Sequence, residues 1–502
     1  ATESVFVQQL DHFAPNKASP TFSQRYLVAD RYYRRGGPVI LYSVGERAVD
    51  EADLTEGWVM EIAKRTRGMA VLLEQRFYGH SMPTADALKG TGSVYEFLAV
   101  EQMMADIRRF MQGFAKDTLG EPLGNSTQRT PWILVGGSFA GSLMAWTKHR
   151  YPELDNAFVL ASSSPMKLTD DYWQFDKVTA ERLPCAELFS AAIQAIDRVL
   201  DSNDGALIQD LKTQFGLSAE ATAEMLAAEL SLQTSWMMQQ PADQLASNQI
   251  RDFCERLQSS SSSSKAGMVR GLADISREFS SEYRVRTPLS ECPAASDDRS
   301  WLWQQCTELG LWQTAPPEHK EPVWFARRLR SRRLNAAYFA SRCRRCFPES
   351  LTKPSAYGRK RREFRMFADA ARAAFESAGS PAHETAGRSA EYAAVFTAGD
   401  LDPWKHTFLS ANLVEIRGAS HAEDLLLRGA DDEVKEEIAR THRVIGSAID
   451  RWIEKKRLGG RVDRALSTKP SRTAAGSLAI NRSGGNRWWT GLLLAQIYEA
   501  AA

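Results

Sequence analysis

The sequence lacks any long, uninterrupted hydrophobic segment. It contains no run of about 18 or more apolar residues, which is the length that a membrane-spanning helix requires. The first residues, ATESVFVQQLDHF, also lack the basic start and apolar continuation of a secretory signal peptide. We therefore expect a soluble, already processed chain with no membrane span.

The sequence also lacks an excess of charge of one sign. The 63 Lys and Arg residues nearly balance the 62 Asp and Glu residues, so the 502-residue chain has a formal net charge of +1. A protein without a strong overall field is not drawn electrostatically to nucleic acid or to an acidic membrane surface. The sequence therefore predicts no nucleic-acid partner, whereas its 43% hydrophobic content is enough for a large core.

Cysteine is scarce, and all of it lies between residues 185 and 346. The six residues are Cys185, Cys254, Cys292, Cys306, Cys343 and Cys346. They can pair in about 15 ways, so spacing alone does not assign the disulfides. The CRRC segment lacks a second CxxC or HxxxH to complete a metal cage, so neither a metal nor any other cofactor is expected. Together with glycosylation sequons at Asn125 and Asn481, the cysteines favour an oxidising compartment.

Short apolar runs that end in Gly, Ser or Pro alternate with helical patterns in the first 165 residues. These runs lie at 37–46, 68–79, 131–137 and 156–165. Such runs are typical of strands buried on both faces of a parallel sheet. Residues 93–114, with apolar positions three and four apart, predict a helix between two of the strands. The alternation of strand and helix predicts an α/β sheet.

The middle of the chain, from about 170 to 385, has a mostly helical pattern. Residues 217–233 predict one of its helices, with Ser218 as the N-cap. The serine run at 259–264 predicts a flexible surface loop. This part of the chain is therefore expected to form a helical insertion.

Strand patterns return at 391–404 and 411–425, and an amphipathic helix follows at 431–456. The sheet is therefore expected to be completed here. Beyond Gly459 no periodic pattern is sustained, which predicts a poorly ordered or loosely docked tail. The expected parts are 1–168 and 389–458 for the sheet domain, 169–388 for a helical, disulfide-bearing cap, and 459–502 for the tail.

The segment ILVGGSFAGSLMAW, residues 133–146, runs from a strand pattern through two glycines into a serine and then into a helix pattern. A buried strand that ends in Gly-x-Ser-x-small and enters a helix at once predicts the nucleophile elbow of an α/β hydrolase, although an ordinary glycine turn is the alternative. The tight turn requires small neighbours, which Gly136, Ala140 and Gly141 provide. Ser138 is therefore the candidate nucleophile of an α/β-hydrolase fold with a large helical cap.

A serine nucleophile needs a histidine base and a carboxylate that orients it. In this fold the chain order is serine, acid, histidine. His421 follows a strand pattern and lies among small residues, whereas two other histidines lie within helix patterns, so His421 is the candidate base. Asp400 and Asp402 are about equally well placed to be the acid, and Asp424 is a third candidate.

An oxyanion hole needs two backbone N–H donors. The residue after the nucleophile, Phe139, is the expected first donor. The second is expected from the loop SVGERAV, which follows the first strong strand pattern, near Gly45 or Glu46.

Several separate stretches agree, in order, with one known family. QQLDHFAP, FSQRY, LEQRFYGHSMP, GGSFAGSLMAWTKHRYPE, ASSSPM, WQQCTELGLWQT, GDLDPW and SHAEDL resemble the proline-specific serine exopeptidases, which include prolylcarboxypeptidase, dipeptidyl peptidase II and thymus-specific serine protease. The resemblance covers about residues 5–455, and SFAGSL and CTELG are most similar to the thymus-specific branch. It implies a hydrolase fold whose cap is held by disulfides, with Ser138 as nucleophile, Asp402 as acid and His421 as base.

The resemblance also implies an activity. It implies a serine-type carboxypeptidase or dipeptidyl peptidase that cleaves after proline through an acyl-enzyme, and that is secreted or located in a lysosome or vacuole. Peptide substrates are then the expected partners, and homodimer formation is left open. Glu308, in CTELG, is a candidate for binding a substrate amino group or for a buried structural role. An esterase or lipase of the same fold and an inactive, binding version of the fold are the alternative functions.

Overall fold

In the computed structural model, the chain forms two units, Ala1–Gly460 and Arg461–Ala502. The described residues are 1–14, 19–55, 57–85, 95–121, 130–240, 244–261, 264–282, 292–293, 297–317, 327–351, 354–378, 393–426 and 432–467. Asn125 and Asn481, the two predicted glycosylation sites, lie outside them. Among the described residues, no helix has both the length and the apolar character needed to cross a bilayer.

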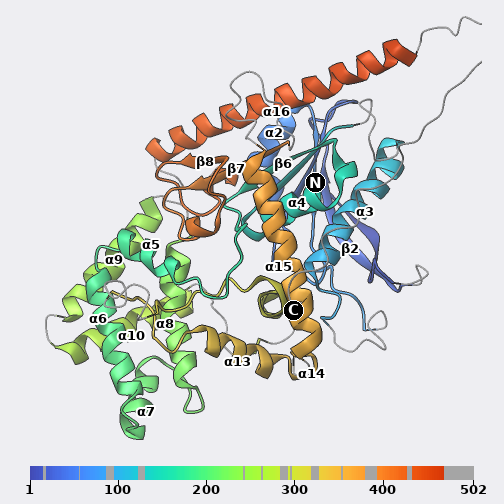
Figure 1. The fold of residues 1–502 in the computed structure, drawn as a ribbon. Helices are drawn as coiled ribbons and strands as arrows, with labels where there is room; N and C mark the ends of the chain where they lie inside the picture. The colour runs from blue at the N-terminus through green and yellow to red at the C-terminus, as the bar shows by residue number, and fades with distance from the viewer. Residues whose placement is uncertain are drawn as a thin grey trace, which may run out of the picture. The chain divides into compact units, whose positions relative to one another are not determined.

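One mixed sheet is formed by eight strands among the described residues, in the order β1-β2-β4-β3-β5-β6-β7-β8 (Figure 1). The strands are β1 Thr2–Gln9, β2 Thr21–Ala29, β3 Val39–Ser43, β4 Met69–Leu73, β5 Trp132–Gly137, β6 Ala157–Ser162, β7 Ala394–Gly399 and β8 Leu413–Ile416. β2 pairs antiparallel with β1 and β4, whereas the strands from β4 to β8 are all parallel. This is the α/β-hydrolase fold that the sequence predicts.

Helices flank the strands and fill the long interval between β6 and β7. They are α1 Ala52–Thr55, α2 Trp58–Thr66, α3 Val100–Leu119, α4 Ser138–Arg150, α5 Gln174–Arg182, α6 Ala186–Leu200, α7 Gly205–Gln214, α8 Ala223–Met237, α9 Gln244–Ser261, α10 Lys265–Glu282, α11 Asp297–Gln304, α13 Ala336–Cys346, α14 Pro348–Leu351, α15 Pro354–Ser377 and α16 Asp432–Ser467. Short helical turns are η2 Pro152–Leu154, η3 Gln305–Leu309, η5 Lys405–Thr407 and η6 Glu423–Leu425.

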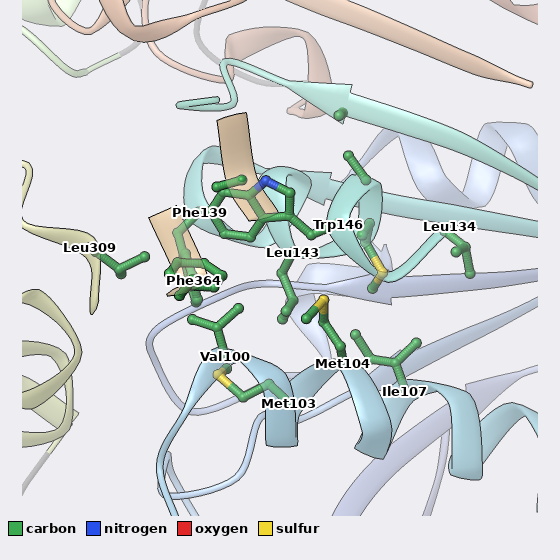
Figure 2. Close-up of a cluster of buried hydrophobic side chains, with 14 of the residues drawn as sticks. Val100, Met103, Met104, Ile107, Leu134, Phe139, Leu143, Trp146, Leu309 and Phe364 are labelled. Atoms are coloured by element: carbon green, nitrogen blue, oxygen red, sulfur yellow. The ribbon is translucent and has the colours of Figure 1, made fainter. Parts of the chain in front are cut away.

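The two faces of the sheet bury different helices, because successive side chains of a strand point to opposite faces. Leu41 of β3 packs in a core with α3 and α4, and its neighbour Ile40 packs in a second core with α2 and α16. Figure 2 shows part of the first core, where Leu143 and Trp146 of α4 lie in one cluster with the α3 methionines. Helix α4, which follows the predicted elbow, is therefore anchored along its buried length.

Helices α5 to α10, green in Figure 1, pack on one another around an apolar core of their own. A disulfide between Cys185 and Cys254 crosses this group. Two further disulfides tie the α11–η3 region to α13, and they are Cys292–Cys346 and Cys306–Cys343. The CRRC segment thus contributes one cysteine to each of these two disulfides and forms no metal half-site.

Three local expectations were wrong. The N-cap of helix α8 is Thr222 and not Ser218, since Oγ1 of Thr222 accepts the Met225 N–H at 3.1 Å. Ser218 begins a turn, in which its carbonyl accepts the N–H of Ala221. Of the serine run predicted as a loop, 259–261 are helical, and two of their hydroxyls donate to the carbonyl of Arg256 in the last turn of α9. Residues 262–263 lie outside the described part of the chain, and residue 264 is not helical. Helix α16 continues past Gly459 to Ser467, so two glycines weaken the helix pattern without ending it.

Candidate active site

Ser138 is the first residue of α4, at the sharp turn that follows β5. Its φ angle is 52°, in the left-handed region, which strains a residue with a side chain. The turn is tight, because a Cβ atom on Gly136 would lie 2.5 Å from the carbonyl carbon of Ala140. A Cβ atom on Gly141 would collide with the hydroxyl of Ser164. The small residues around the serine therefore allow α4 to pack directly on the end of its strand.

His421 and Asp402 lie within hydrogen-bonding distance on the loops that follow β8 and β7. Nδ1 of His421 is 2.8 Å from Oδ2 of Asp402. A carboxylate only accepts hydrogen bonds, so the imidazole donates through Nδ1, and Nε2 of the neutral ring remains an acceptor. The N–H of Trp404 donates to the other carboxylate oxygen, also at 2.8 Å. Asp402 is 0% exposed, so both of its oxygens are held in a fixed orientation.

The two other candidate acids have different partners. Oδ1 of Asp400 accepts the N–H of Gly418 at 2.7 Å, which ties the loop after β7 to the loop after β8. Asp424 accepts hydrogen bonds from the hydroxyls of Ser162 and Thr397, on β6 and β7. These two carboxylates therefore hold the loops in place, and a third carboxylate contacts the imidazole.

The loop that carries His421 contacts the elbow. The N–H of the next residue, Ala422, donates to Oγ of Ser163 at 2.8 Å. Ser163 directly follows β6, which pairs with β5. A Cβ atom on Gly137 would lie 3.2 Å from Cβ of Ala422. The residue after the imidazole is thus packed against the residue before Ser138.

The surroundings of His421 favour its charged form. Burial disfavours the imidazolium, but the carboxylates of Asp402 and Glu46 outweigh burial and raise the pKa of His421 above its ordinary 6.5. Burial also raises the pKa of Glu46. The neutral ring, which is the form that accepts a proton, is therefore reached at a higher pH than for an ordinary histidine.

Two backbone segments meet at the first turn of α4. The N–H of Phe139 belongs to this turn, whose first amides have no acceptor within the helix. Gly45, in the loop after β3, has a φ angle of 87°, and a Cβ atom there would lie 3.6 Å from Cβ of Ala140. Its own N–H is directed at Oγ of Ser43, at 3.3 Å. The loop expected to supply the second oxyanion donor thus lies beside the elbow.

A cavity of about 770 Å³ opens beside Ser138. Its aromatic lining residues are Phe139, Trp236, Trp301, Trp312, Tyr338, Phe339 and Trp404. Trp312 and Phe339 stack with ring centroids 4.6 Å apart, and Phe139 meets Trp301 at 5.6 Å. The cavity therefore offers flat apolar surfaces next to the serine, in a space large enough for a small organic ligand or a peptide end.

The end of helix α8 is bonded to both of the loops that carry the acid and the base. The carbonyl of Met238 accepts from the hydroxyl of Ser420 at 3.0 Å. Arg182 donates to the same carbonyl and to that of Leu401, both at 2.7 Å. Nε1 of Trp404 donates to a side-chain oxygen of Gln239, also at 2.7 Å. The interval between β6 and β7 thus contacts the acid and base loops as well as the cavity.

Glu308 lies at the start of α3. Its carboxylate accepts the N–H of Val100 at 2.9 Å, it is 7% exposed, and burial raises its pKa to about 7. It is not among the residues that line the cavity beside Ser138. These contacts fit a buried structural role for Glu308 better than a role in binding a substrate amino group.

Two features of the site were not predicted from the sequence, and they are the contact made by Ser163 and the aromatic walls of the cavity. The sequence could have indicated Ser163, because it follows β6, which pairs with the strand before Ser138. The carboxyl ends of parallel strands gather at one edge of a sheet. The aromatic walls carried no such signal, because separate helices and loops bring them together. Within the described residues, no group of three or more potential metal ligands is clustered.

Comparison with known proteins agrees with this fold. Residues 8–442 match the family described as serine carboxypeptidase S28. The chain is 27% identical over 511 residues to serine protease vicPb of Bipolaris victoriae (strain FI3), covering 89% of this chain and 88% of that protein. It is 28% identical over 323 residues to the thymus-specific serine protease of Homo sapiens, covering 59% and 60% of the two chains. It is 32% identical over 185 residues to the lysosomal Pro-X carboxypeptidase of Homo sapiens, covering 36% and 33%.

The family match extends over the sheet domain and over the helices between β6 and β7. It includes the elbow, the acid loop and the base loop. The chain therefore belongs to the serine carboxypeptidase S28 family and is a serine-type exopeptidase on an α/β-hydrolase fold.

Proposed function

We propose that Ser138, His421 and Asp402 form a catalytic triad that hydrolyses peptide bonds through an acyl-enzyme. Oγ of Ser138 attacks the scissile carbonyl carbon while Nε2 of His421 takes its proton, and Asp402 keeps the ring in the productive tautomer. His421 then gives this proton to the leaving amine, and the peptide C–N bond breaks. Water attacks the acyl-enzyme by the same proton route and releases the acid product and Ser138.

The negative oxygen of each tetrahedral intermediate requires two donors. We assign the first to the N–H of Phe139 and the second to the Gly45–Glu46 segment, which lies against the same turn of α4. The first turn of a helix also stabilises negative charge through its dipole. Both assignments are supported by the first turn of α4, to which Phe139 belongs and against which Gly45 lies.

For the substrate we propose a peptide with proline before the cleaved bond. A pyrrolidine ring is compact and apolar, and the aromatic walls of the cavity suit it. One relative is named a Pro-X carboxypeptidase, which agrees with this preference. The same relative is named lysosomal, and three disulfides suit an oxidising compartment. We accordingly propose that the protein acts outside the cell or in a lysosome or vacuole.

The observation that carries the proposal is the 2.8 Å bond between Asp402 and His421, whose loop packs against the elbow. A fluorophosphonate probe, which reacts with activated serines, tests it. We expect labelling of the natural chain, loss of labelling in Ser138→Ala, and retained labelling in Ser142→Ala. Ser142 is the matched control because it lies one turn further along the same helix and bonds the carbonyl of Pro165.

A digest of a peptide library, read by mass spectrometry, then identifies the cleaved bond. Cleavage after proline at a chain end supports the proposal. Turnover of short acyl esters but of no peptide would favour an esterase. A folded, disulfide-bonded protein that reacts with no probe from acidic to neutral pH would favour the inactive, binding version of the fold.

A further inference from the structure

Few of the described residues that line the cavity beside Ser138 are charged. They are Glu46, Asp298, Arg330 and Arg342. Nε of Arg330 is 2.8 Å from a carboxylate oxygen of Asp176, and both side chains are buried. Arg342 also has an interaction within the structure. Arg330 is therefore already neutralised by a carboxylate and is not a free cation for the carboxylate end of a peptide.

Glu46 differs from the arginines. Within the described part of the chain, its carboxylate forms no ion pair, because the adjacent Arg47 turns away to Asp53, with an N–O distance of 3.0 Å. Glu46 is half-buried and lies close enough to His421 to affect its pKa. A carboxylate that loses water without gaining a cation is costly, and a positively charged ligand removes this cost.

We propose that the carboxylate of Glu46 binds the protonated amino group at the start of a peptide, so that the enzyme cleaves at the amino end of its substrate. This inference rests on the proposed function, because it takes the cavity beside Ser138 as the substrate site. Glu46 belongs to the loop that lies against the elbow, so an amino group held there is close to the cleaved bond. A peptide carboxylate would instead be bound by a cation or by backbone N–H groups of the cavity.

The test compares two dipeptide substrates, alanyl-prolyl reporter amides with a free and with an acetylated amino group. Both are measured at a pH above the acidic limb of the activity profile, where His421 is neutral in every variant. We expect the natural enzyme to prefer the free amine. Glu46→Gln should raise KM for the free amine about ten- to a hundredfold, because a hydrogen bond to a charged group is lost. The acetylated substrate should change by a few-fold at most, so the preference disappears.

The control is Glu61→Gln, which removes the same charge from an exposed position on α2. This variant should keep the natural preference. Equal loss for both substrates in Glu46→Gln would overturn the amine site and leave a catalytic or structural role. A natural enzyme that ignores acetylation and requires a free carboxyl end would overturn it as well.

The fluorophosphonate experiment separates this inference from the function on which it rests. Loss of labelling in Ser138→Ala, together with an unchanged substrate preference in Glu46→Gln, defeats the amine site alone. Absence of labelling and of peptide cleavage in the natural chain defeats both. Thermal unfolding of Glu46→Gln, compared with that of the natural chain, confirms that the variant is folded.

Discussion

At the scale of single residues, the contact between His421 and Asp402 matters because it fixes which nitrogen carries a proton. Asp402 has one oxygen on Nδ1 of the ring and the other on the N–H of Trp404. With both oxygens engaged, the carboxylate cannot rotate away without losing two hydrogen bonds. Nε2 is thereby left as the acceptor nitrogen, which is the role that the proposed triad requires.

Replacing Asp402 by Asn should lower kcat/KM about 10⁴-fold, because an amide that donates to Nδ1 favours the wrong tautomer. The measurement is the hydrolysis of a prolyl reporter peptide. Asp400→Asn is the matched control, because Asp400 bonds Gly418 in the neighbouring loop. We expect it to cost about tenfold or less, in line with one weakened hydrogen bond. Equal effects of the two changes would contradict the choice of acid.

The pH profile of kcat/KM tests the electrostatics of His421. The proposed base acts in its neutral form, and its pKa is raised, so activity should increase with pH through a midpoint above 6.5. Glu46→Gln removes one of the negative charges that raise this pKa, so the midpoint should move to lower pH. The acetylated substrate is used, because it has no amino group that titrates. A natural midpoint at or below 6.5 would refute the shift, and so would an unchanged midpoint in the variant.

The site also shows what residue patterns can and cannot resolve. Chain order and flanking small residues led to Ser138 and His421 without coordinates. Asp400 and Asp402 follow the same strand two positions apart, so only the path of the loop decides which carboxylate reaches the ring. The resemblance favoured Asp402, and its contact with the imidazole supports that choice.

At the scale of elements, the elbow depends on how closely α4 approaches β5. Gly136→Ala should destabilise the protein by about 1–3 kcal/mol or more and abolish labelling of Ser138, because the new methyl group meets the backbone of Ala140. Thermal unfolding and probe labelling measure the two effects. Gly205→Ala is the control, because no atom lies within 4 Å of a Cβ atom there. A tolerated alanine at 136 would mean that the turn is looser than described.

Strand prediction succeeded where both faces of a strand are buried. Four strands, β3 to β6, produced continuous apolar runs, which need no knowledge of their neighbours. β7 and β8 were predicted from returning strand patterns, although Glu415 of β8 is exposed. β1 and β2 were not predicted. In β1, Val5 and Val7 are exposed, whereas the polar Gln8 is buried. The side-chain amide of Gln8 donates hydrogen bonds to the side-chain oxygen of Gln24 and to the carbonyl of Asp106. Only the folded chain brings these partners together. Buried polar pairs of this kind are invisible to hydrophobic periodicity.

At the scale of the whole molecule, disulfides hold the part of the chain that supplies much of the cavity wall. Cys306–Cys343 closes a loop of 37 residues between the segments that bear Trp312 and Phe339. Replacing both cysteines by serine should lower the free energy of unfolding by about 2–4 kcal/mol. It should also raise KM for a prolyl peptide while Ser138 still reacts with the probe, because the elbow lies on the sheet.

The disulfide between Cys185 and Cys254 provides the comparison. It joins the start of α6 to α9, neither of which supplies a described lining residue, whereas η3 and α13, which Cys306–Cys343 joins, both do. Its removal should therefore lower the unfolding temperature without a comparable rise in KM. If both double variants raise KM equally, the two disulfides do not differ in their effect on the cavity.

The bonds at the end of α8 restrict how a substrate gains access. Lifting this edge of the helical region would break the contacts of Met238 and Gln239 with Ser420 and Trp404. Ser420 is next to His421 in the chain, and Trp404 lies two residues after Asp402. An opening at this edge would therefore disturb the proposed triad at every turnover. Entry and release are therefore expected to leave this edge closed and to use another rim of the cleft.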